Sequence, residues 1–445
     1  MRTVGWRRHA TAAAWLATAF AIGVHALLFW IEQSPEPRQL LGDERTYLQA
    51  ALRVRAGEPA GLEPLWPPLY PYFLALLLGP GGDRRGVEVA QVILLAGVAW
   101  LVGDIWRRLG PAPALSPVLA AAVLGVPALA AFAHYLWPEI LHLFFVVAAL
   151  WILAARRQST LWAAAYGVLL ALATLTKLLL APLLPALLLP LALSPGRRVL
   201  RPVVAAAAIL LVLAPAALRN RRSYGVAVVA DSSRFNLWIG LNDRARTSFG
   251  DSVIEREFPI YLQSAPTFRE RQEILERKIR DLVRSAGWIR ILRQQLGRQY
   301  FRLLDKDNFL IEQLPGGRLA ERGAGYRRPN PAAASALRIA SHATYAALLV
   351  AAAFGMTWAP QRGWHLFGLS LLAYAAGLFL LLHVKSRYLA PFLPLLLFYA
   401  FFAVVAWREP AAGGALRRHW LGWLLGGILA AVLLGLSLAG PLLDR

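Results

Sequence analysis

The sequence predicts an all-α, polytopic membrane protein, and three observations carry that prediction. The chain has 445 residues, of which 58% are hydrophobic. Apolar runs of about 20 residues, the length that crosses a bilayer as a helix, recur along it. The basic residues fall mostly in short connections between these runs, as the positive-inside rule expects of cytoplasmic loops.

The apolar runs predict a bundle of about 11 transmembrane helices. They lie near residues 10–31, 87–105, 116–133, 138–155, 160–176, 178–193, 199–217, 336–356, 364–382, 388–406 and 420–440. The first run is too long for a cleaved signal peptide and lacks a clear small-residue cleavage site, so we expect a retained span. With a cytoplasmic N-terminus, arginine pairs such as Arg107-Arg108 and Arg156-Arg157 are all cytoplasmic. We therefore expect a multi-pass protein of the inner (cytoplasmic) cell membrane.

Residues 32–86 form the expected first outer loop of an N-terminal membrane half, residues 1–217. A helix is expected from about Asp43 to Arg55. The proline-rich stretch at 67–78 is too short for a span, and we expect it to form an interfacial helix. The outer face of this loop is where we expect the catalytic groups.

Residues 218–335 form a second expected outer region, followed by C-terminal membrane helices at 336–445. Residues 226–229 are β-prone. Residues 268–304 carry apolar side chains at helical spacing against an Arg/Glu-rich face, which predicts an amphipathic helix. Such a helix lies on anionic lipid or packs on the membrane domain, and the net charge of +22 therefore does not indicate nucleic-acid binding.

Four separated charged clusters fall on the predicted outer face. They are Asp43-Glu44, Glu139, Lys177 and Lys385 with Arg387. Each alone has an ordinary structural explanation, because acids favour helix starts and long basic side chains extend to the headgroups. Together they form an inventory for group transfer from a lipid phosphate. A carboxylate can take the proton of an acceptor hydroxyl, while Lys and Arg stabilise charge on the departing phosphate.

Other chemistries are disfavoured by composition. The chain has no cysteine, which removes thiolate catalysis and Cys-ligated metals, and its eight histidines are scattered without paired spacing. It contains no P-loop and no convincing dinucleotide fingerprint, and its cytoplasmic loops are too short for a nucleotide-sugar domain. An outer-facing transferase would then need an activated donor delivered by the membrane.

Six short motifs, taken in order, resemble the GT-C-fold glycosyltransferases that use lipid-linked sugars, in particular bacterial protein mannosyltransferases and aminoarabinose transferases. The motifs are Gly-Asp-Glu-x-x-Tyr at 42–47, Pro-Pro-Leu-Tyr-Pro at 67–71, Trp-Pro-Glu at 137–139, Leu-Thr-Lys at 175–177, Leu-Arg-Asn at 218–220 with Asn-Leu-Trp-Ile-Gly at 236–240, and Arg-Tyr-Leu-x-Pro at 387–391. None is specific alone, but the ordered set covers most of the chain.

The resemblance implies an inverting membrane glycosyltransferase, of use in cell-envelope glycosylation, that moves a hexosyl or pentosyl group from a polyprenyl-phosphate donor to a hydroxyl of an extracytoplasmic glycan, lipid or protein. It implies a catalytic group of Asp43, Glu44 and Glu139, with Asp43 as general base. Donor-phosphate ligands would be Lys177, Arg219, Lys385, Arg387 and Tyr388, and pocket residues would be Tyr47, Tyr70, His134 and Asn236.

Cofactor use stays open, because some branches of the family need a divalent cation and others do not. The family often has a second Asp where this chain has Glu139, and the larger soluble C-terminal domain of some relatives is missing. Two other functions remain as alternatives: a transporter or flippase for a lipid-linked or polar solute, and a structural subunit of an envelope complex. The near absence of mid-membrane acids argues against a transporter.

Overall fold

The computed structural model describes residues 3–32, 40, 43–157, 159–194, 196, 198–242, 252–307, 311, 314–315, 330–360, 362–409 and 412–439. Gly42 of the first motif, and parts of the expected outer regions 32–86 and 218–335, lie outside these residues. Every regular element in the described part is a helix, which confirms the all-α prediction. The β-prone segment at 226–229 is extended but forms no strand, because no neighbouring strand among the described residues pairs with it.

Six helical stretches are long and apolar enough to cross a membrane, as a polytopic protein requires. They are α1 (Thr3–Glu32), α4 (Arg85–Leu109), α11 (Leu200–Tyr224), α18 (Pro331–Trp358), the 3₁₀ helix η5 (Ser386–Phe392) with α20 (Leu393–Arg408), and α22 (Trp420–Leu438). A seventh span is possible by length if α5 (Ser116–Gly125), preceded by η2 (Pro113–Leu115), continues into α6 (Pro127–Ala133). The two halves of this pair meet at a bend of 59°.

Shorter apolar helices occupy the four remaining expected positions. They are α7 (Glu139–Ala154), α8 (Thr160–Thr176), α19 (Gly363–Leu378), and a broken segment of η3 (Leu178–Leu183), α9 (Leu184–Leu187) and α10 (Leu189–Leu193). The broken segment was expected as one span. Pro182, Pro185 and Pro190 each lack the backbone N–H that a continuous helix uses, so the segment divides.

Local sequence sets several helix ends. Ser159 and Asn330 accept backbone N–H groups at the starts of α8 and α18, and Pro331 occupies the first position of α18, where its missing N–H costs nothing. Gly225 ends α11 in the left-handed conformation, with φ of 72°. These signals were readable in the sequence.

The membrane helices pack around one continuous apolar core. Helix α18 packs on α20 and α22, α8 on α11 and α7, and α4 on α5 and α7. At one crossing the backbones are so close that a methyl group on Gly355 would overlap the carbonyl oxygen of Tyr399. This close approach holds α18 against α20, the helix that follows η5, in which Arg387 lies.

The remaining helices are short or polar. They are α2 (Asp43–Arg55), α3 (Leu69–Leu77), η1 (Pro80–Gly82), α12 (Ser233–Asn242), α13 (Ser252–Gln263), α14 (Phe268–Ala286), α15 (Trp288–Arg298), η4 (Tyr300–Leu304) and α21 (Ala415–Arg418). The two helices expected in the first loop are thus present as α2 and α3. Helix α12 lies in the second expected outer region, for which the sequence analysis predicted only one helical stretch, at 268–304.

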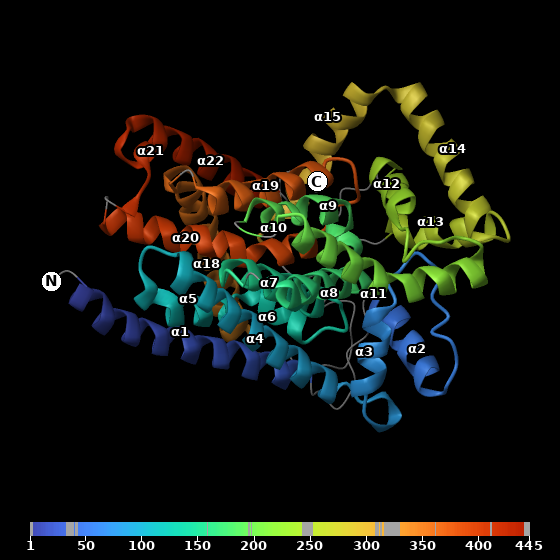
Figure 1. Cartoon of the computed structure of the whole chain (residues 1–445), viewed down its shortest axis with the longest axis horizontal. Helices are drawn as coiled ribbons and strands as arrows, with labels where there is room; N and C mark the ends of the chain where they lie inside the picture. Colours follow the sequence, from blue (N-terminus) through green and yellow to red (C-terminus); the bar gives the residue numbers. More distant parts are fainter. Residues whose placement is uncertain are drawn as a thin grey trace.

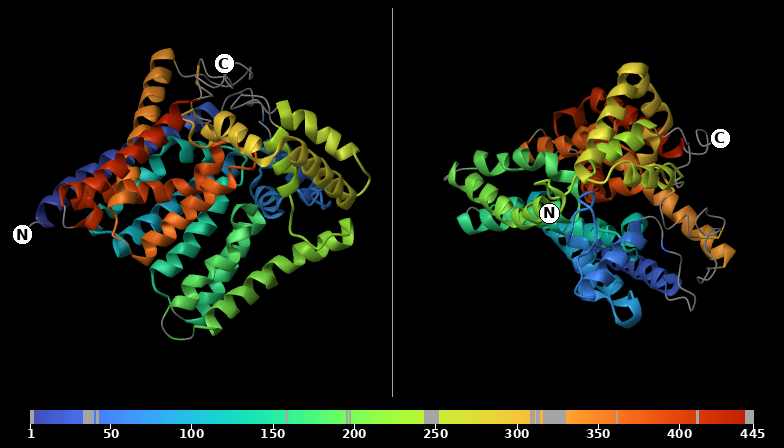
Figure 2. Two further views of the ribbon diagram at one scale, coloured as in Figure 1. Left: turned by 90° about the horizontal axis from the view of Figure 1, so that it is seen from above. Right: turned by 90° about the vertical axis from the view of Figure 1, so that its right-hand side faces the viewer.

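The amphipathic stretch at 268–304 is helical but divided. A capping box of Thr267 and Glu270 starts α14. Gly287, with φ of 74°, separates α14 from α15. The two helices form an arch that projects beside the bundle (Figures 1 and 2).

The two ends of the molecule differ in content. Figure 1 shows the N-terminus and α21 at one end of the long axis, and α2, α3, α13 and α14 at the other. Helices of the first and second expected outer regions therefore lie at the same end of the molecule. The candidate site lies where these helices join the bundle.

Candidate active site

Arg387 joins two carboxylates that come from distant parts of the chain. Its Nη2 donates to Asp43 Oδ2 at 2.6 Å, across a separation of 344 residues. Its Nε lies 4.0 Å from Glu139 Oε1. Asp43 is the first residue of α2, Glu139 the first residue of α7, and Arg387 the second residue of η5. Three helix starts therefore meet at one point.

Lys177 completes this group of charges. It is the residue after α8, with an extended backbone, and its Nζ donates to Glu139 Oε1 at 2.9 Å. The Glu139 side chain is 1% exposed and the Lys177 side chain 18%. The pair is buried enough that each charge depends on the other. We call Asp43, Glu139, Lys177 and Arg387 the charged cluster.

Aromatic rings surround the two cations. The Arg387 guanidinium lies 5.0 Å from the ring centroid of Trp137 and 5.6 Å from that of Tyr388. Lys177 Nζ lies 5.1 Å from the Tyr388 centroid. Tyr388 stacks in turn on Phe379, with centroids 5.2 Å apart. These cation–π contacts fix the direction of both side chains and exclude water from one side of them.

Glu44, the second acid of α2, is directed away from solvent. It is fully buried, and its Oε1 accepts the backbone N–H of Leu136 at 2.9 Å. This bond fastens the start of α2 to the segment before α7. Glu44 therefore links the loop that carries Asp43 to the helix that carries Glu139.

Asp43 is the accessible acid of the three. Its side chain is 33% exposed, whereas those of Glu44 and Glu139 are at most 1% exposed. Burial alone would raise the pKa of Asp43, but the charges of Arg387, Lys385 and Lys177 outweigh it and hold the pKa below its ordinary value. Asp43 is thus an ionised carboxylate that a molecule outside the cluster can reach.

Two buried tyrosines, one on α2 and one on α3, pack against each other beside the charged cluster. Tyr47 and Tyr70 meet edge to face, with centroids 5.2 Å apart, and burial raises the pKa of both phenols well above the usual range. Tyr70 donates to Gln91 Oε1 at 2.9 Å, and Gln91 Nε2 donates to the carbonyl oxygens of Ala133 and Tyr135. Both tyrosines therefore stay neutral.

Three predicted site residues form hydrogen bonds with groups outside the charged cluster. Arg219 donates to Asn220 Oδ1, and Asn236 Nδ2 donates to Ser232. The Asn236 carbonyl accepts the N–H of His383, which places α12 against the chain just before Lys385. His134 hydrogen-bonds His25 at 3.0 Å, and burial lowers its pKa to about 4. It is a neutral group behind the cluster.

His142 is a residue that the sequence analysis missed. It is fully buried one turn after Glu139, its Nδ1 lies 3.0 Å from the carbonyl oxygen of Ala173, and its Nε2 has no hydrogen-bond partner. The carbonyl requires the proton on Nδ1, so Nε2 is an acceptor. The three-residue spacing from Glu139 on one helix was the available signal.

The arrangement does not suit a bridging divalent cation. Among the described residues no three His, Asp or Glu side chains gather as metal ligands. The Arg387 guanidinium contacts Asp43 and lies near Glu139, where a metal shared by these carboxylates would bind. The positive charge beside these carboxylates comes from Arg387 and Lys177.

The fold and this cluster define a multi-pass membrane protein whose acidic and basic side chains meet at one end of a helical bundle. Residues 66–218 match the model of a family described as dolichyl-phosphate-mannose-protein mannosyltransferase. The match supports a GT-C-type membrane glycosyltransferase of mannosyltransferase type, as the motifs predicted. It includes Glu139 and Lys177 but neither Asp43 nor Arg387. No curated protein and no solved structure matches the chain.

Proposed function

We propose that this protein transfers a sugar from a polyprenyl-phosphate donor to a hydroxyl group of a glycan, lipid or protein acceptor on the outer membrane face, with inversion and with Asp43 as general base. One observation carries the proposal. The most exposed carboxylate of the cluster is ion-paired to Arg387, beside the buried pair of Glu139 and Lys177. A base and phosphate ligands thus stand within one hydrogen-bonded group.

The step balances as a single displacement. Asp43 takes the proton of the acceptor hydroxyl as the oxygen attacks the anomeric carbon. The bond from that carbon to the phosphate oxygen breaks, and its electrons stay on the polyprenyl phosphate. The leaving phosphate gains a negative charge, which Arg387, Lys177 and Lys385 would stabilise.

Two unpaired polar atoms support a bound polar ligand at this point. Arg387 Nε and Glu139 Oε2 are buried without a hydrogen-bond partner. A buried donor or acceptor left unpaired costs about 1–3 kcal/mol. A phosphate oxygen of the donor would satisfy Arg387 Nε, and a buried water molecule would satisfy Glu139 Oε2.

The unequal exposure of the acids supports an inverting reaction. A retaining reaction through a covalent intermediate needs a second carboxylate able to reach the anomeric carbon. Glu139 is the neighbouring candidate, but its Oε1 is bound to Lys177 and its side chain is buried. One accessible base and no free nucleophile favour a single displacement.

The test is Asp43→Asn, with Asp83→Asn as the matched control. Asp83 lies in the same outer loop but is paired at the surface with Arg85, outside the cluster. Transfer from a synthetic polyprenyl-phosphate mannose, read as released polyprenyl phosphate by mass spectrometry, should fall about 10²–10⁴-fold in Asp43→Asn and stay near wild type in Asp83→Asn.

Either of two results would contradict the proposal. Folded Asp43→Asn protein that transfers at the wild-type rate would remove Asp43 as the base. Wild-type protein that moves lipid-linked sugars across vesicles but releases no polyprenyl phosphate, with any sugar or acceptor offered, would favour a transporter.

A further inference from the structure

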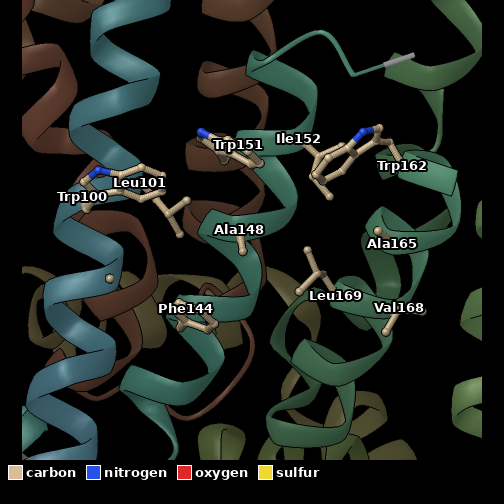
Figure 3. A pocket seen from close by; sticks show the side chains of 11 residues that line it. Trp100, Leu101, Phe144, Ala148, Trp151, Ile152, Trp162, Ala165, Val168 and Leu169 are labelled. Atoms are coloured by element: carbon tan, nitrogen blue, oxygen red, sulfur yellow. The ribbon is translucent and has the colours of Figure 1, made fainter. Parts of the chain in front are cut away.

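An open apolar groove of about 450 Å³ runs between α4, α7 and α8. Figure 3 shows three tryptophans, Trp100, Trp151 and Trp162, at one end of it, and Phe144 and Leu169 toward the other. The Trp151 ring lies 6.3 Å from that of Trp100 and 6.0 Å from that of Trp162. Trp100 is 63% exposed, so the groove opens on the outside of the bundle.

The tryptophan end of the groove is basic. The guanidinium of Arg157 lies 5.2 Å from the Trp162 ring, and that of Arg108 lies 6.0 Å from the Trp151 ring. The Trp151 Nε1 donates to Asp104 at 2.8 Å, and Asp104 also binds Arg107 and Arg108. Asp104 therefore fixes the Trp151 ring, and its single negative charge offsets one of the two positive charges of Arg107 and Arg108.

The charges at this end do not cancel. Neither Arg156 nor Arg157 has an ion pair with a carboxylate of the described residues, and both are exposed. With Asp104 against Arg107 and Arg108, the end carries a net charge of +3. An apolar groove that ends in tryptophans and an excess of arginines matches an amphiphile with an anionic head.

We propose that this groove binds an anionic glycerophospholipid, with its phosphate at Arg157 and Arg108 and one acyl chain along the groove toward Phe144. This site differs from that of the sugar donor. Trp151 lies about 18 Å along α7 from Glu139, at a rise of 1.5 Å per residue. The lipid head would therefore bind at the opposite end of α7 from the charged cluster, in the leaflet that the arginine pattern predicts to be cytoplasmic.

The bound lipid closes a gap in the wall of the bundle. The groove separates α4 from α8, which meet through α7. An acyl chain there would contact all three helices and connect α8, the helix before Lys177, to α4. We therefore expect the lipid to raise the unfolding temperature of the detergent-solubilised protein.

Native mass spectrometry of the full chain tests the proposal, with phosphatidylglycerol and phosphatidylcholine of identical acyl chains as probes. Wild-type protein should retain phosphatidylglycerol in preference. Arg157→Gln should weaken phosphatidylglycerol binding about fivefold and phosphatidylcholine binding less, because the choline cation offsets the charge of the phosphate. Arg362→Gln is the matched control: Arg362 is also exposed at a predicted cytoplasmic loop, but only Arg157 lies against Trp162, a residue that lines the groove.

A second variant tests the groove itself. Ala165→Trp places a ring in the groove and should abolish both the bound lipid and its thermal stabilisation. Equal binding of the two lipids, or an unchanged affinity in Arg157→Gln, would overturn the proposal. So would displacement of phosphatidylglycerol by equimolar polyprenyl phosphate, which would assign the groove to the donor. Because Arg157 is exposed, its variant is expected to fold even if Ala165→Trp does not.

Discussion

Arg387 sets the electrostatics of the proposed base. Among the neighbouring cations, Arg387 lowers the pKa of Asp43 the most, against the opposite effect of burial. A depressed pKa keeps the carboxylate ionised but makes it a weaker base. A donor phosphate bound to Arg387 would compete for that cation, so we expect the proton affinity of Asp43 to rise when the donor binds.

Replacing Arg387 should move the acidic limb of the pH profile. In Arg387→Gln the largest lowering influence on the Asp43 pKa is lost while burial remains, so that pKa rises. The acidic limb of kcat/KM should shift to higher pH, with an overall loss of about 10- to 100-fold from the missing charged hydrogen bond. A pH series with the wild-type protein in parallel measures it, and an unmoved limb would contradict the assignment.

The same ion pair affects stability in a defined direction. Because the Asp43 pKa is lower in the folded protein than in the unfolded chain, the pair stabilises the fold above the ordinary carboxyl pKa. This contribution is lost as the pH falls through the lowered value.

Glu139 and Lys177 should be strongly coupled. Lys177→Met leaves the buried Glu139 carboxylate without its partner and should cost about 3–5 kcal/mol of unfolding free energy, while Lys177→Met with Glu139→Gln should recover most of it. Thermal unfolding of the wild type, the two single variants and the double variant in one detergent gives the coupling free energy between the two residues. Sugar transfer should be lost in the Lys177→Met variant and should not recover in the double variant. Additive effects on stability would mean that the two residues do not form a pair.

At the scale of elements, α18 and α20 depend on a glycine contact. Gly355→Ala forces a methyl group against the Tyr399 carbonyl and should destabilise the bundle by about 1–3 kcal/mol. Gly435→Ala on α22 is the control, since a methyl group there meets nothing within 4 Å. Thermal unfolding compares them, and equal unfolding temperatures would show that α18 and α20 can separate without cost.

The sequence could predict most elements and the separate pieces of the site. Hydropathy located the apolar helices, and acids at helix starts marked Asp43 and Glu139. The predictions were wrong where the side-chain pattern does not report the hydrogen bonding of the backbone. Residues 178–193 are apolar enough to span, but their prolines break the helix. Residues 226–229 favour β structure by side chain and have no partner strand in the described part of the chain.

The contacts within the site could not be predicted. The pairing of Asp43 with Arg387 depends on how α2 and η5 pack, over 344 residues of chain. No local pattern encodes such a distance. The contacts of His142 and the direction of the Arg219 side chain could not be predicted either. Each depends on which helix packs opposite the residue.

At the scale of the whole molecule, orientation in the membrane remains a prediction, and the absence of cysteine makes it measurable. We expect Glu273→Cys, exposed on α14, to react with a membrane-impermeant maleimide in intact cells. Arg362→Cys should react only after permeabilisation. Both residues are exposed, so the difference reports the side of the membrane. The reverse pattern would place the charged cluster on the cytoplasmic face.

The contact between Asp43 and Arg387 also bears on biosynthesis. Asp43 leaves the ribosome long before Arg387, the residue that positions its carboxylate, is made. A nascent or prematurely terminated polypeptide, even one with most of its helices inserted, would carry an unassembled catalytic centre. Such fragments would consume none of the cell's costly activated lipid, since the charged cluster is complete only once residue 387 of the 445 has been made.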